Sequence, residues 1–329
     1  MNGRRILVTR RLPGNALDRL SPYDVVLNRH DRAMTREEIL AGAAGAIGLL
    51  CLLTDKIDAA VMDAAGRGLR VISNYAVGYN NIDVAEATRR GILVTNTPGV
   101  LTEATADMAW ALLLAAARRV AEGDRLTRAG RFSGWDPNLL LGADIRRKTL
   151  GLIGLGRIGE AMVKPARGFE MDVVYYDVTR RSAAAEAELG VTYLPLPELL
   201  ARADFVSLHV PLLPETRHLL DEQALRSMKP TAVLVNTSRG AVVDERALVK
   251  ALREGWIAGA GLDVYEDEPA LTAGLTECEN AVLAPHIASA TRGTRLRMAE
   301  MAVDNLLAGL AGNRPAHLVN REAWEARPR

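Results

Sequence analysis

Residues 149–159 read TLGLIGLGRIG, so an apolar run leads directly into glycines with the spacing GxGxxG. A strand before this pattern and a helix after it are typical of a turn that binds dinucleotides. The first glycine allows the tight bend, the second lets a pyrophosphate approach the backbone, and the third lets the helix pack on the strand. We therefore expect a strand over residues 149–153, a helix to about residue 168, and a dinucleotide held at Gly154, Gly156 and Gly159. The alternative is a structural turn whose glycines serve packing alone.

An acidic residue stands where this fingerprint requires one, after the next apolar run. Asp177 closes the run Val173–Tyr176, about 20 residues past the glycines. A carboxylate there accepts hydrogen bonds from the adenosine ribose and repels a 2′-phosphate, which favours NAD(H). Arg180 and Arg181 follow immediately, and two guanidinium groups are suited to clamp a 2′-phosphate. NADP(H) therefore stays open as the second choice.

Short β-branched runs alternate with helical patterns on both sides of this turn. Such alternation is typical of parallel sheets covered by helices. We predict an α/β protein with two Rossmann-like, doubly wound parallel-sheet domains, the second with six or so strands. Besides residues 149–153, the expected strands are 6–9, 25–27, 46–50, 69–75, 92–95, 173–176, 205–209, 232–235, 258–264 and 281–283.

Two longer patterns with helical spacing are expected to join these domains. One runs from Thr102 to about Leu126 without a proline, and the other runs from Thr291 to about Leu310. If the second packs back on the first unit, that domain is discontinuous. We therefore predict a substrate domain of residues 1–98 plus 287–329 and a dinucleotide-binding domain of residues 99–286. Elsewhere, Thr35 and Glu38 have the spacing of a capping box, which predicts a helix start.

Composition excludes several classes of protein. The 329 residues are 49% hydrophobic and 25% charged, as in ordinary globular proteins and unlike disordered chains. Lys and Arg number 41 against 40 Asp and Glu, so no overall field attracts nucleic acid or anionic lipid. The most apolar window, Met108–Ala117, is about half of the ~20 residues that a membrane span needs. Cys51 and Cys278 form no metal-ligand pattern, so we expect no metal site and a reducing, cytoplasmic setting.

Three polar residues follow apolar runs, at the strand ends where open α/β sheets bind their ligands. Arg239 stands in NTSRG at 236–240, Glu268 in DVYEDEP at 263–269, and His286 in APHIAS at 284–289. Each also has a plain structural interpretation: Arg239 as a helix-cap donor, Glu268 as a solvated loop acid, and His286 as a histidine satisfied by backbone. Together they form a candidate catalytic set.

With the glycine turn, these segments resemble the D-isomer-specific 2-hydroxyacid dehydrogenase family over nearly the whole chain, and most closely its glyoxylate/hydroxypyruvate reductases. The resemblance also rests on NYAVGYNNID at 74–83, FSGWDP at 132–137, LLLG at 139–142 and LVNR at 318–321. It implies that Arg239 binds the substrate carboxylate and carbonyl oxygen, that His286 acts as acid and base, and that Glu268 holds and charges the imidazole. The chemistry agrees, because hydride transfer to a keto carbon builds negative charge on oxygen, which a proton donor and a guanidinium stabilise.

The resemblance implies further contacts. The backbone N–H groups of Val77 and Gly78 would cradle the substrate carboxylate, although the loop alone also reads as an ordinary turn. Leu53 and Trp135 would shape a small apolar pocket, with Trp135 reaching in from a neighbouring subunit unless it only covers a loop. Because helix 102–126 and the loop to Gly142 form the dimer contact in relatives, a homodimer is expected. Family positions at the dinucleotide correspond to Thr105, Arg157, Ile158, Pro211, Thr237, Ser238, Asp263 (at the nicotinamide carboxamide) and His286.

The expected function is NAD(P)H-dependent reduction of glyoxylate, hydroxypyruvate or a similar short 2-keto acid to the 2-hydroxy acid. The expected partner is this small molecule, with neither nucleic acid nor membrane. A 2-ketogluconate-type reductase or a phosphite dehydrogenase stays open, because small changes in apolar contact discriminate by only ~1–3 kcal/mol. An alternative from another class is an NAD(H)-sensing binding protein like the co-repressors of this fold. Turnover with any 2-keto acid would exclude it.

Overall fold

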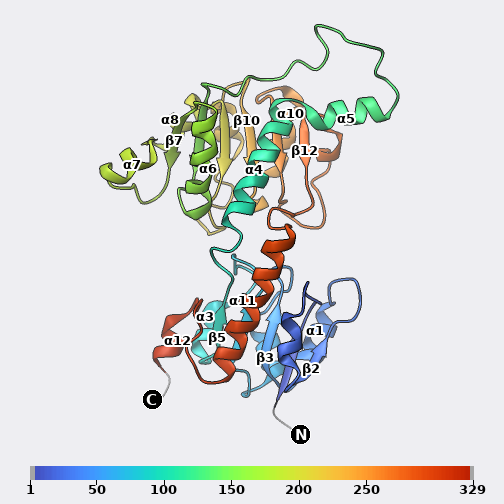
Figure 1. Cartoon of the computed structure of the whole chain (residues 1–329), viewed down its shortest axis with the longest axis vertical. Helices are drawn as coiled ribbons and strands as arrows, with labels where there is room; N and C mark the ends of the chain where they lie inside the picture. Colours follow the sequence, from blue (N-terminus) through green and yellow to red (C-terminus); the bar gives the residue numbers. More distant parts are fainter. Residues whose placement is uncertain (1–3, 327–329) are drawn as a thin grey trace. The chain divides into compact units, whose positions relative to one another are not determined.

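The computed structural model describes residues 4–326 and divides the chain into two compact units. Unit 1 extends to Leu101 and resumes at Ala290, and unit 2 is Thr102–Ser289. Within the described residues the strands form one five-stranded and one seven-stranded sheet, and all strand pairs in both are parallel. The predicted α/β class with two parallel sheets is confirmed (Figure 1).

The sheet of unit 1 has the strand order β2-β1-β3-β4-β5, so the direction of winding reverses between β1 and β3. Its strands are β1 (Arg5–Val8), β2 (Asp24–Leu27), β3 (Ala46–Cys51), β4 (Val71–Asn74) and β5 (Leu93–Thr95). Its helices are η1 (Ala16–Leu20), α1 (Arg36–Ala43), α2 (Ala59–Ala65), α3 (Val84–Arg89), α11 (Arg292–Leu310) and α12 (Arg321–Glu325).

Local signals in the sequence set the helices of unit 1. The Thr35 hydroxyl accepts a hydrogen bond from Glu38 N–H, and the Glu38 carboxylate accepts one from Thr35 N–H, which confirms the predicted capping box. Helix α11 packs on β3 and β4, where Ser73 Oγ donates to Ala302 O at 2.8 Å. The second part of the unit therefore completes the core of the first.

The sheet of unit 2 has the order β12-β11-β10-β9-β6-β7-β8, so winding reverses between β6 and β9. Its strands are β6 (Thr149–Ile153), β7 (Asp172–Tyr176), β8 (Val191–Tyr193), β9 (Phe205–Leu208), β10 (Val233–Asn236), β11 (Gly259–Leu262) and β12 (Ala281–Leu283). Its helices are α4 (Thr102–Ala117), α5 (Val120–Arg128), α6 (Arg157–Gly168), α7 (Ala183–Leu189), α8 (Leu196–Arg202), α9 (Glu222–Ser227), α10 (Glu245–Glu254), η2 (Gly240–Val242) and η3 (Leu275–Glu277).

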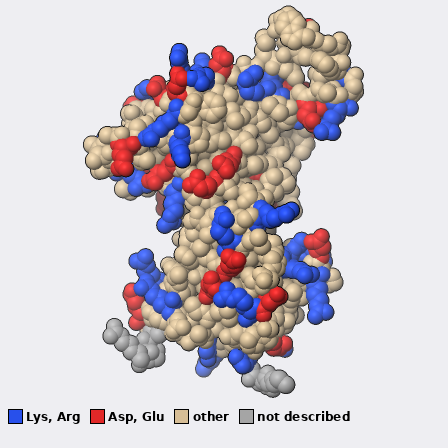
Figure 2. Space-filling model, viewed as in Figure 1, with Lys and Arg blue, Asp and Glu red and all other residues tan. Residues whose placement is uncertain are grey.

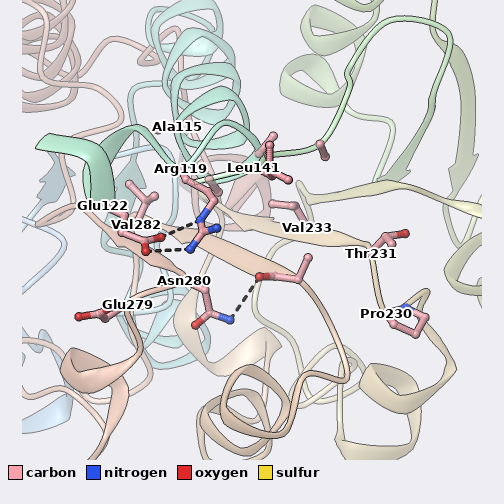
Figure 3. A pocket seen from close by; sticks show the side chains of 15 residues that line it. Ala115, Arg119, Glu122, Leu141, Pro230, Thr231, Val233, Glu279, Asn280 and Val282 are labelled. Carbon is pink, nitrogen blue, oxygen red and sulfur yellow. Dashed lines mark hydrogen bonds and ion pairs between the residues drawn. The ribbon is translucent and has the colours of Figure 1, made fainter. Parts of the chain in front are cut away.

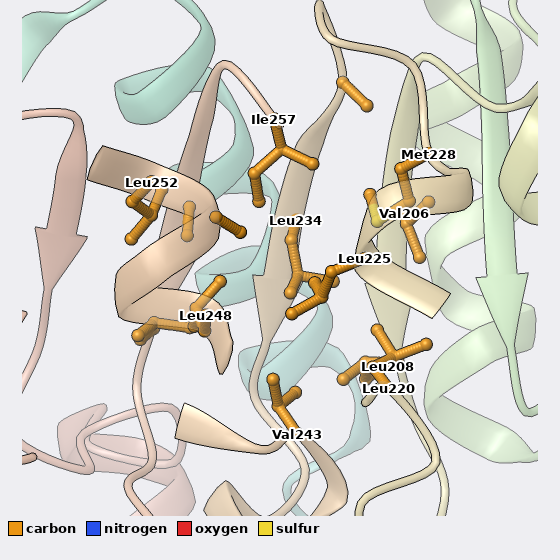
Figure 4. Packing of buried hydrophobic residues seen from close by; sticks show 14 of the residues in the cluster. Val206, Leu208, Leu220, Leu225, Met228, Leu234, Val243, Leu248, Leu252 and Ile257 are labelled. Carbon is orange, nitrogen blue, oxygen red and sulfur yellow. The ribbon is translucent and has the colours of Figure 1, made fainter. Parts of the chain in front are cut away.

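Helices cover both faces of this sheet. On one face, Leu225 of α9 and Leu248 of α10 pack with Leu234 of β10 (Figure 4). On the other face, Trp110 of α4 and Met162 of α6 belong to a second buried cluster. Burial on both faces explains why the strands read as continuous apolar runs. Strand β8 was not predicted: it is three residues long at the edge of the sheet, and its middle residue, Thr192, is exposed, so it shows no continuous apolar run.

The prediction of one helix over residues 102–126 is wrong. Helix α4 ends at Ala117, Arg119 takes a left-handed φ of 54°, and α5 begins at Val120. Helix α4 packs on α6, β10 and β11, which cover its apolar surface, whereas none of the described residues of α5 is buried. The helix therefore breaks where its packing ends, and the Arg119 guanidinium donates to Glu122 beyond the break.

Charges are mixed over the surface seen in Figure 2, where basic and acidic side chains are interspersed. Between residues 4 and 326, no helix is both long enough and apolar enough to cross a membrane. The same residues hold no group of three or more His, Cys, Asp or Glu side chains arranged for a metal ion.

Candidate active site

The glycine turn joins β6 to α6 where the winding of unit 2 reverses, which is where open sheets bind their ligands. Gly154 has a φ of 94°, and a side chain there would meet the backbone of His209. A side chain on Gly159 would collide with Gly154 O. Gly156 instead faces open space, and it leaves the N-terminus of α6 without a side-chain cap. The backbone N–H groups and the positive end of the helix dipole there fit a pyrophosphate.

A buried hydroxyl also fits a bound dinucleotide. Among the described residues, Thr237 Oγ1 is one of three buried side-chain atoms without a hydrogen-bond partner. A buried polar group without a partner is unfavourable, and a ligand would supply one. The other residues predicted at the dinucleotide lie at or near the ends of elements in unit 2: Arg157 and Ile158 open α6, Thr105 is buried in α4, Pro211 follows β9, and Ser238 follows β10.

Asp177 follows β7 and binds the glycine turn. One of its carboxylate oxygens accepts from Leu155 N–H at 2.8 Å, and the other accepts from Thr179 N–H at 3.3 Å. The side chain is thus fixed beside the turn that would hold the pyrophosphate. This is the position from which a carboxylate reaches an adenosine ribose.

The two arginines after Asp177 already have partners. Arg180 donates to both carboxylate oxygens of Glu186, and Arg181 donates to Glu160 and to Leu155 O. The sequence shows the two arginines but does not show which acids pair with them. Glu160 of α6, for example, reaches the loop after β7 only through helix packing. The predicted clamp for a 2′-phosphate therefore consists of guanidinium groups that are already paired.

Arg239 lies on a tight turn after β10. Asn236, the last residue of the strand, donates from Nδ2 to Arg239 O at 2.9 Å, and its Oδ1 accepts from the N–H and the hydroxyl of Ser238. A side chain on Gly240 would overlap the backbone of Tyr265, so only glycine fits there. Burial lowers the pKa of Arg239, and the negative charge of Glu268 offsets this in part. Asn236 was not predicted as a site residue, although a polar residue that closes an apolar strand is a signal for one.

Glu268 and His286 meet from the loops after β11 and β12. Glu268 Oε2 lies 2.8 Å from His286 Nδ1, and Oε1 accepts from Tyr265 N–H at 2.9 Å. Burial alone would raise the pKa of Glu268, but the hydrogen bonds from His286 and Tyr265 outweigh it, and the pKa is lowered. Glu268 is therefore a carboxylate that orients the imidazole through Nδ1. The second ring nitrogen, Nε2, is left to act on a ligand.

Asp263 holds the backbone next to His286. It is fully buried, and its two oxygens accept from the N–H groups of Ile287 and Ala288 at 2.7 Å each. His286 has a φ of 54°, in the left-handed region that few side chains adopt. Burial raises the pKa of Asp263, and the two N–H groups offset this in part. The residue predicted at the nicotinamide carboxamide thus also positions the histidine, which the sequence did not indicate.

This arrangement combines an anion site with a proton site. Arg239 is a fixed cation, and it and His286 both interact with the charge of Glu268. A guanidinium can bind a carboxylate and polarise a carbonyl, while an imidazole held by a carboxylate can give or take a proton. The geometry therefore supports acid–base chemistry on an anionic carbonyl compound.

Three predicted substrate residues lie in unit 1, on the loops after β3 and β4: Leu53, Val77 and Gly78. Two asparagines that were not predicted support these loops. Asn74 Nδ2 donates to Gly78 O at 2.8 Å and to Asn81 Oδ1 at 3.1 Å. Asn81 Nδ2 donates to the carbonyl oxygens of residues 52 and 55, at 2.9 and 3.0 Å. The amide pair therefore ties the two loops together.

A buried carboxyl group completes this support. Asp55 Oδ2 accepts from Thr9 Oγ1 at 2.5 Å and from Leu52 N–H at 2.7 Å. Burial raises the pKa of Asp55, and the two hydrogen bonds offset this in part. Thr9 follows β1 and Asp55 follows β3, so the group fills the point where the winding of unit 1 reverses.

Trp135 lies on an exposed segment between α5 and β6. Its side chain is 86% exposed, and Phe132 and Leu141 nearby are also largely exposed. A cavity of about 350 Å³ lies beneath Leu141 and the Arg119–Glu122 pair (Figure 3). Its floor includes the amino ends of β10 and β12, whereas Arg239 and His286 follow the carboxyl ends. The cavity is therefore separate from the candidate catalytic set.

Comparison with a family model adds to this geometry. The model of the "D-isomer specific 2-hydroxyacid dehydrogenase, NAD binding domain" matches residues 110–288. The glyoxylate reductase of Korarchaeum cryptofilum is 53% identical to this chain over 327 residues, which cover 98% of each protein.

Two crystal structures are similar over almost the whole chain. A Thermus thermophilus protein is 51% identical, with a TM-score of 0.89, and the match covers 96% of this chain and 99% of the other. The NADPH-dependent glyoxylate/hydroxypyruvate reductase of Sinorhizobium meliloti, solved with NADP and malonate, is 35% identical, with a TM-score of 0.85. That match covers 100% of this chain and 99% of the other. The fold of both units is therefore shared with enzymes of this kind.

Proposed function

This chain belongs to the D-isomer-specific 2-hydroxyacid dehydrogenase family, and from that premise we propose that it reduces glyoxylate, hydroxypyruvate or a similar short 2-keto acid. It is an NAD(P)-dependent oxidoreductase. The observation that carries the proposal is the contact of 2.8 Å between Glu268 and His286, in the same unit as Arg239 and the glycine turn. Full-length similarity to glyoxylate reductases supports the substrate class.

In the proposed reaction, His286 and Arg239 act on the carbonyl oxygen of the keto acid. A reduced nicotinamide, when bound, supplies the hydride. Arg239 binds the carboxylate and the carbonyl oxygen, which stabilises the negative charge that develops there. His286 donates the proton from Nε2 while Glu268 holds Nδ1. In the reverse direction, neutral His286 takes the proton from the hydroxy acid.

Unit 1 is proposed to bind the carboxylate end of the substrate. The backbone N–H groups of Val77 and Gly78 lie on a loop that Asn74 and Asn81 fix in place. Leu53 is proposed to limit the size of the pocket, because its loop is tied to the same amide pair. The dinucleotide is proposed to contact Thr105, Arg157, Ile158, Pro211, Thr237, Ser238 and Asp263.

We propose NAD(H) as the preferred cofactor. Asp177 is fixed beside the glycine turn by Leu155 N–H, and a carboxylate at this position binds the ribose and repels a 2′-phosphate. Arg180 and Arg181 are engaged by Glu186 and Glu160. The Sinorhizobium meliloti enzyme is NADPH-dependent, so the fold itself does not decide between the two cofactors.

The functional form is proposed to be a cytoplasmic homodimer. In the segment from α5 to Leu141, the apolar side chains of Val120, Phe132 and Trp135 are largely exposed. We propose that a second copy of the chain covers them. Trp135 would then reach the partner's substrate pocket. Cys51 and Cys278 are both unpaired thiols, which fits a reducing compartment. Sedimentation of the purified protein tests this assembly, since a monomer at micromolar concentration contradicts it.

The reaction is tested by the loss of reduced-nicotinamide absorbance on adding glyoxylate or hydroxypyruvate, with NADH and NADPH in parallel. Turnover of ~1–10³ per second with at least one of these acids supports the proposal. 2-Ketogluconate and phosphite with NAD serve as comparison substrates. If the protein binds the dinucleotide but turns over neither short keto acid, the proposed substrate class is wrong.

A further inference from the structure

An acid on the next helix holds the Arg180 guanidinium. Two of its nitrogens donate to Glu186 of α7 at 2.8 and 2.9 Å, and the group lies 5.2 Å from the centre of the Tyr193 ring. Glu186 is only 9% exposed and also accepts from the Tyr175 hydroxyl at 2.8 Å. The bonds from Arg180 and Tyr175 lower the pKa of Glu186 to about 2, so this acid stays charged at neutral pH.

Arg181 is held by the glycine turn and by the helix that follows it. Its guanidinium donates to Glu160 at 2.5 Å and to Leu155 O at 2.6 Å, and its backbone N–H donates to the Tyr175 hydroxyl at 2.8 Å. Glu160 belongs to the first turn of α6, and Leu155 belongs to the glycine turn. The Arg181 side chain therefore bridges the loop after β7 to the start of α6.

Each guanidinium spends part of its donors on a carboxylate, so a 2′-phosphate that binds it must either displace that carboxylate or lie close to its negative charge. If Arg180 leaves, Glu186 becomes a nearly buried negative charge without its cation, which is unfavourable. Together with Asp177, these groups amount to three carboxylates and two guanidiniums. Their net charge is negative, and a phosphate dianion is repelled by it.

We propose that Glu186 and Glu160 set the cofactor preference by keeping Arg180 and Arg181 from a 2′-phosphate. The sequence alone suggests that these two arginines bind the 2′-phosphate of NADP(H). Their pairing with the two acids prevents this. Asp177 alone does not account for the preference, because free arginines beside it would still attract the extra phosphate. The inference rests on the proposed preference for NAD(H) and names further residues that cause it.

The test measures the dissociation constants of NADH and NADPH for the full-length protein by fluorescence titration. Calorimetry with 5′-AMP and 2′-phospho-AMP repeats the comparison without the nicotinamide. Glu186→Gln keeps the size of the side chain and removes its charge. We expect it to tighten NADPH about fivefold, the size of effect found for an ion pair with one solvent-exposed partner, and to change NADH less than twofold. Glu160→Gln, on the surface of α6, is expected to act in the same direction.

Two further variants separate release of the arginine from a general change of charge. Glu188→Gln removes a charge from the same helix, and Glu188 forms no ion pair among the described residues. It should leave the ratio of the two constants unchanged. Adding Arg180→Ala to Glu186→Gln should abolish the gain, because no guanidinium is then released.

The outcomes distinguish this inference from the proposed function. If the unmodified protein prefers NADH and neither Glu186→Gln nor Glu160→Gln tightens NADPH, the inference is wrong and the NAD(H) preference stands. It is also wrong if Glu188→Gln produces the same gain. If the unmodified protein binds NADH and NADPH equally, both the proposed preference for NAD(H) and the proposed role of Glu186 and Glu160 are wrong. If the expected ratios appear but no short keto acid is turned over, only the proposed substrate class fails.

Discussion

The two units reverse their winding in the same way, but they fill the point of reversal differently. In unit 2 the reversal between β6 and β9 holds a glycine turn, where Gly156 faces open space at the start of α6. In unit 1 the reversal between β1 and β3 is occupied by Thr9 and Asp55, which also binds Leu52 N–H. The point of reversal in unit 2 is open to an anionic ligand, whereas polar side chains of the protein itself fill the point of reversal in unit 1.

This difference shows that topology offers a binding site but local sequence decides its use. Glycines leave the backbone of unit 2 accessible, and the charged side chains of Arg239, Glu268 and His286 follow neighbouring strands. Unit 1 instead uses the uncharged amides of Asn74 and Asn81 to hold its loops. We therefore expect changes in unit 2 to affect the chemical step and changes in unit 1 to affect substrate positioning.

The largest effect is expected for His286→Asn. Asparagine tolerates the left-handed φ of 54° found here, but it cannot donate a proton as imidazolium does. We expect kcat for keto-acid reduction to fall about 10³-fold, within the range for loss of a general acid. Steady-state kinetics and NADH titration measure the two effects separately. A variant with unchanged NADH affinity and near-normal kcat would remove His286 from the reaction.

Glu268→Gln is expected to have a smaller effect that depends on pH. Glutamine can still accept from Tyr265 N–H, but it lacks the charge that the lowered pKa of Glu268 preserves. Because the pKa of Glu268 is lowered, its charge is lost only at acidic pH, so the difference in rate between the two proteins should be steady at neutral pH and shrink as the pH falls through the pKa of Glu268. We expect kcat at neutral pH to fall about tenfold to a hundredfold. A reduced kcat with an unmoved pH profile would mean that Glu268 only orients the ring.

Much of unit 2 could be predicted because its chemistry depends on side chains in local patterns. The glycine turn, Asp177 and the polar strand ends around Arg239 and His286 all stand in contiguous segments. The break at Arg119 was missed, because packing of α4 determines it and no proline marks it. The partner of Arg181 was missed for a similar reason, since only the fold brings Glu160 near it, and the partner of Arg180 was missed although Glu186 is six residues away in the sequence.

The support of unit 1 could not be predicted in the same way. Backbone N–H groups at Val77 and Gly78 carry no side-chain signal, so only resemblance indicated them. The sequence did not single out Asn74, which lies near the end of a predicted strand, or Asn81, and their reciprocal hydrogen bond depends on how two loops meet. A site built from backbone is recognised in a sequence by the polar side chains that hold it, and these are less distinctive than catalytic groups.

Asn81→Ala tests whether unit 1 acts through positioning. The change removes the hydrogen bonds to Leu52 O and Asp55 O and the pairing with Asn74. We expect KM for the keto acid to rise about tenfold while kcat changes less than threefold, because loop order supports binding more than proton transfer. Asn15→Ala, which removes an amide that makes no side-chain cap in the same unit, is the matched control. An equal loss in kcat and no change in KM would contradict the division between the units.

The smallest effect is expected for Asp55→Asn, and it distinguishes Asp55 from Asp177. Both carboxylates accept a loop N–H after a strand, but only Asp177 is proposed to use its charge. The two hydrogen bonds of Asp55 reach the same oxygen, which asparagine also offers. Burial raises the pKa of Asp55, so the folded state binds this proton more tightly than the unfolded state, and the ionised group lowers stability at neutral pH.

We therefore expect Asp55→Asn to be more stable than the unmodified protein at pH 7, because asparagine keeps the hydrogen-bonded oxygen without the buried charge. This advantage should shrink as the pH falls through the raised pKa, because the unmodified side chain then becomes neutral too. Urea unfolding of both proteins at a series of pH values measures the difference, while NADH affinity should stay the same. A variant that is less stable at pH 7 would show that unit 1 needs the charge of Asp55, for instance toward Arg10, whose charge favours the ionised form. The two points of reversal would then both depend on a charged carboxylate, and they would differ only in whether glycine leaves room for a ligand.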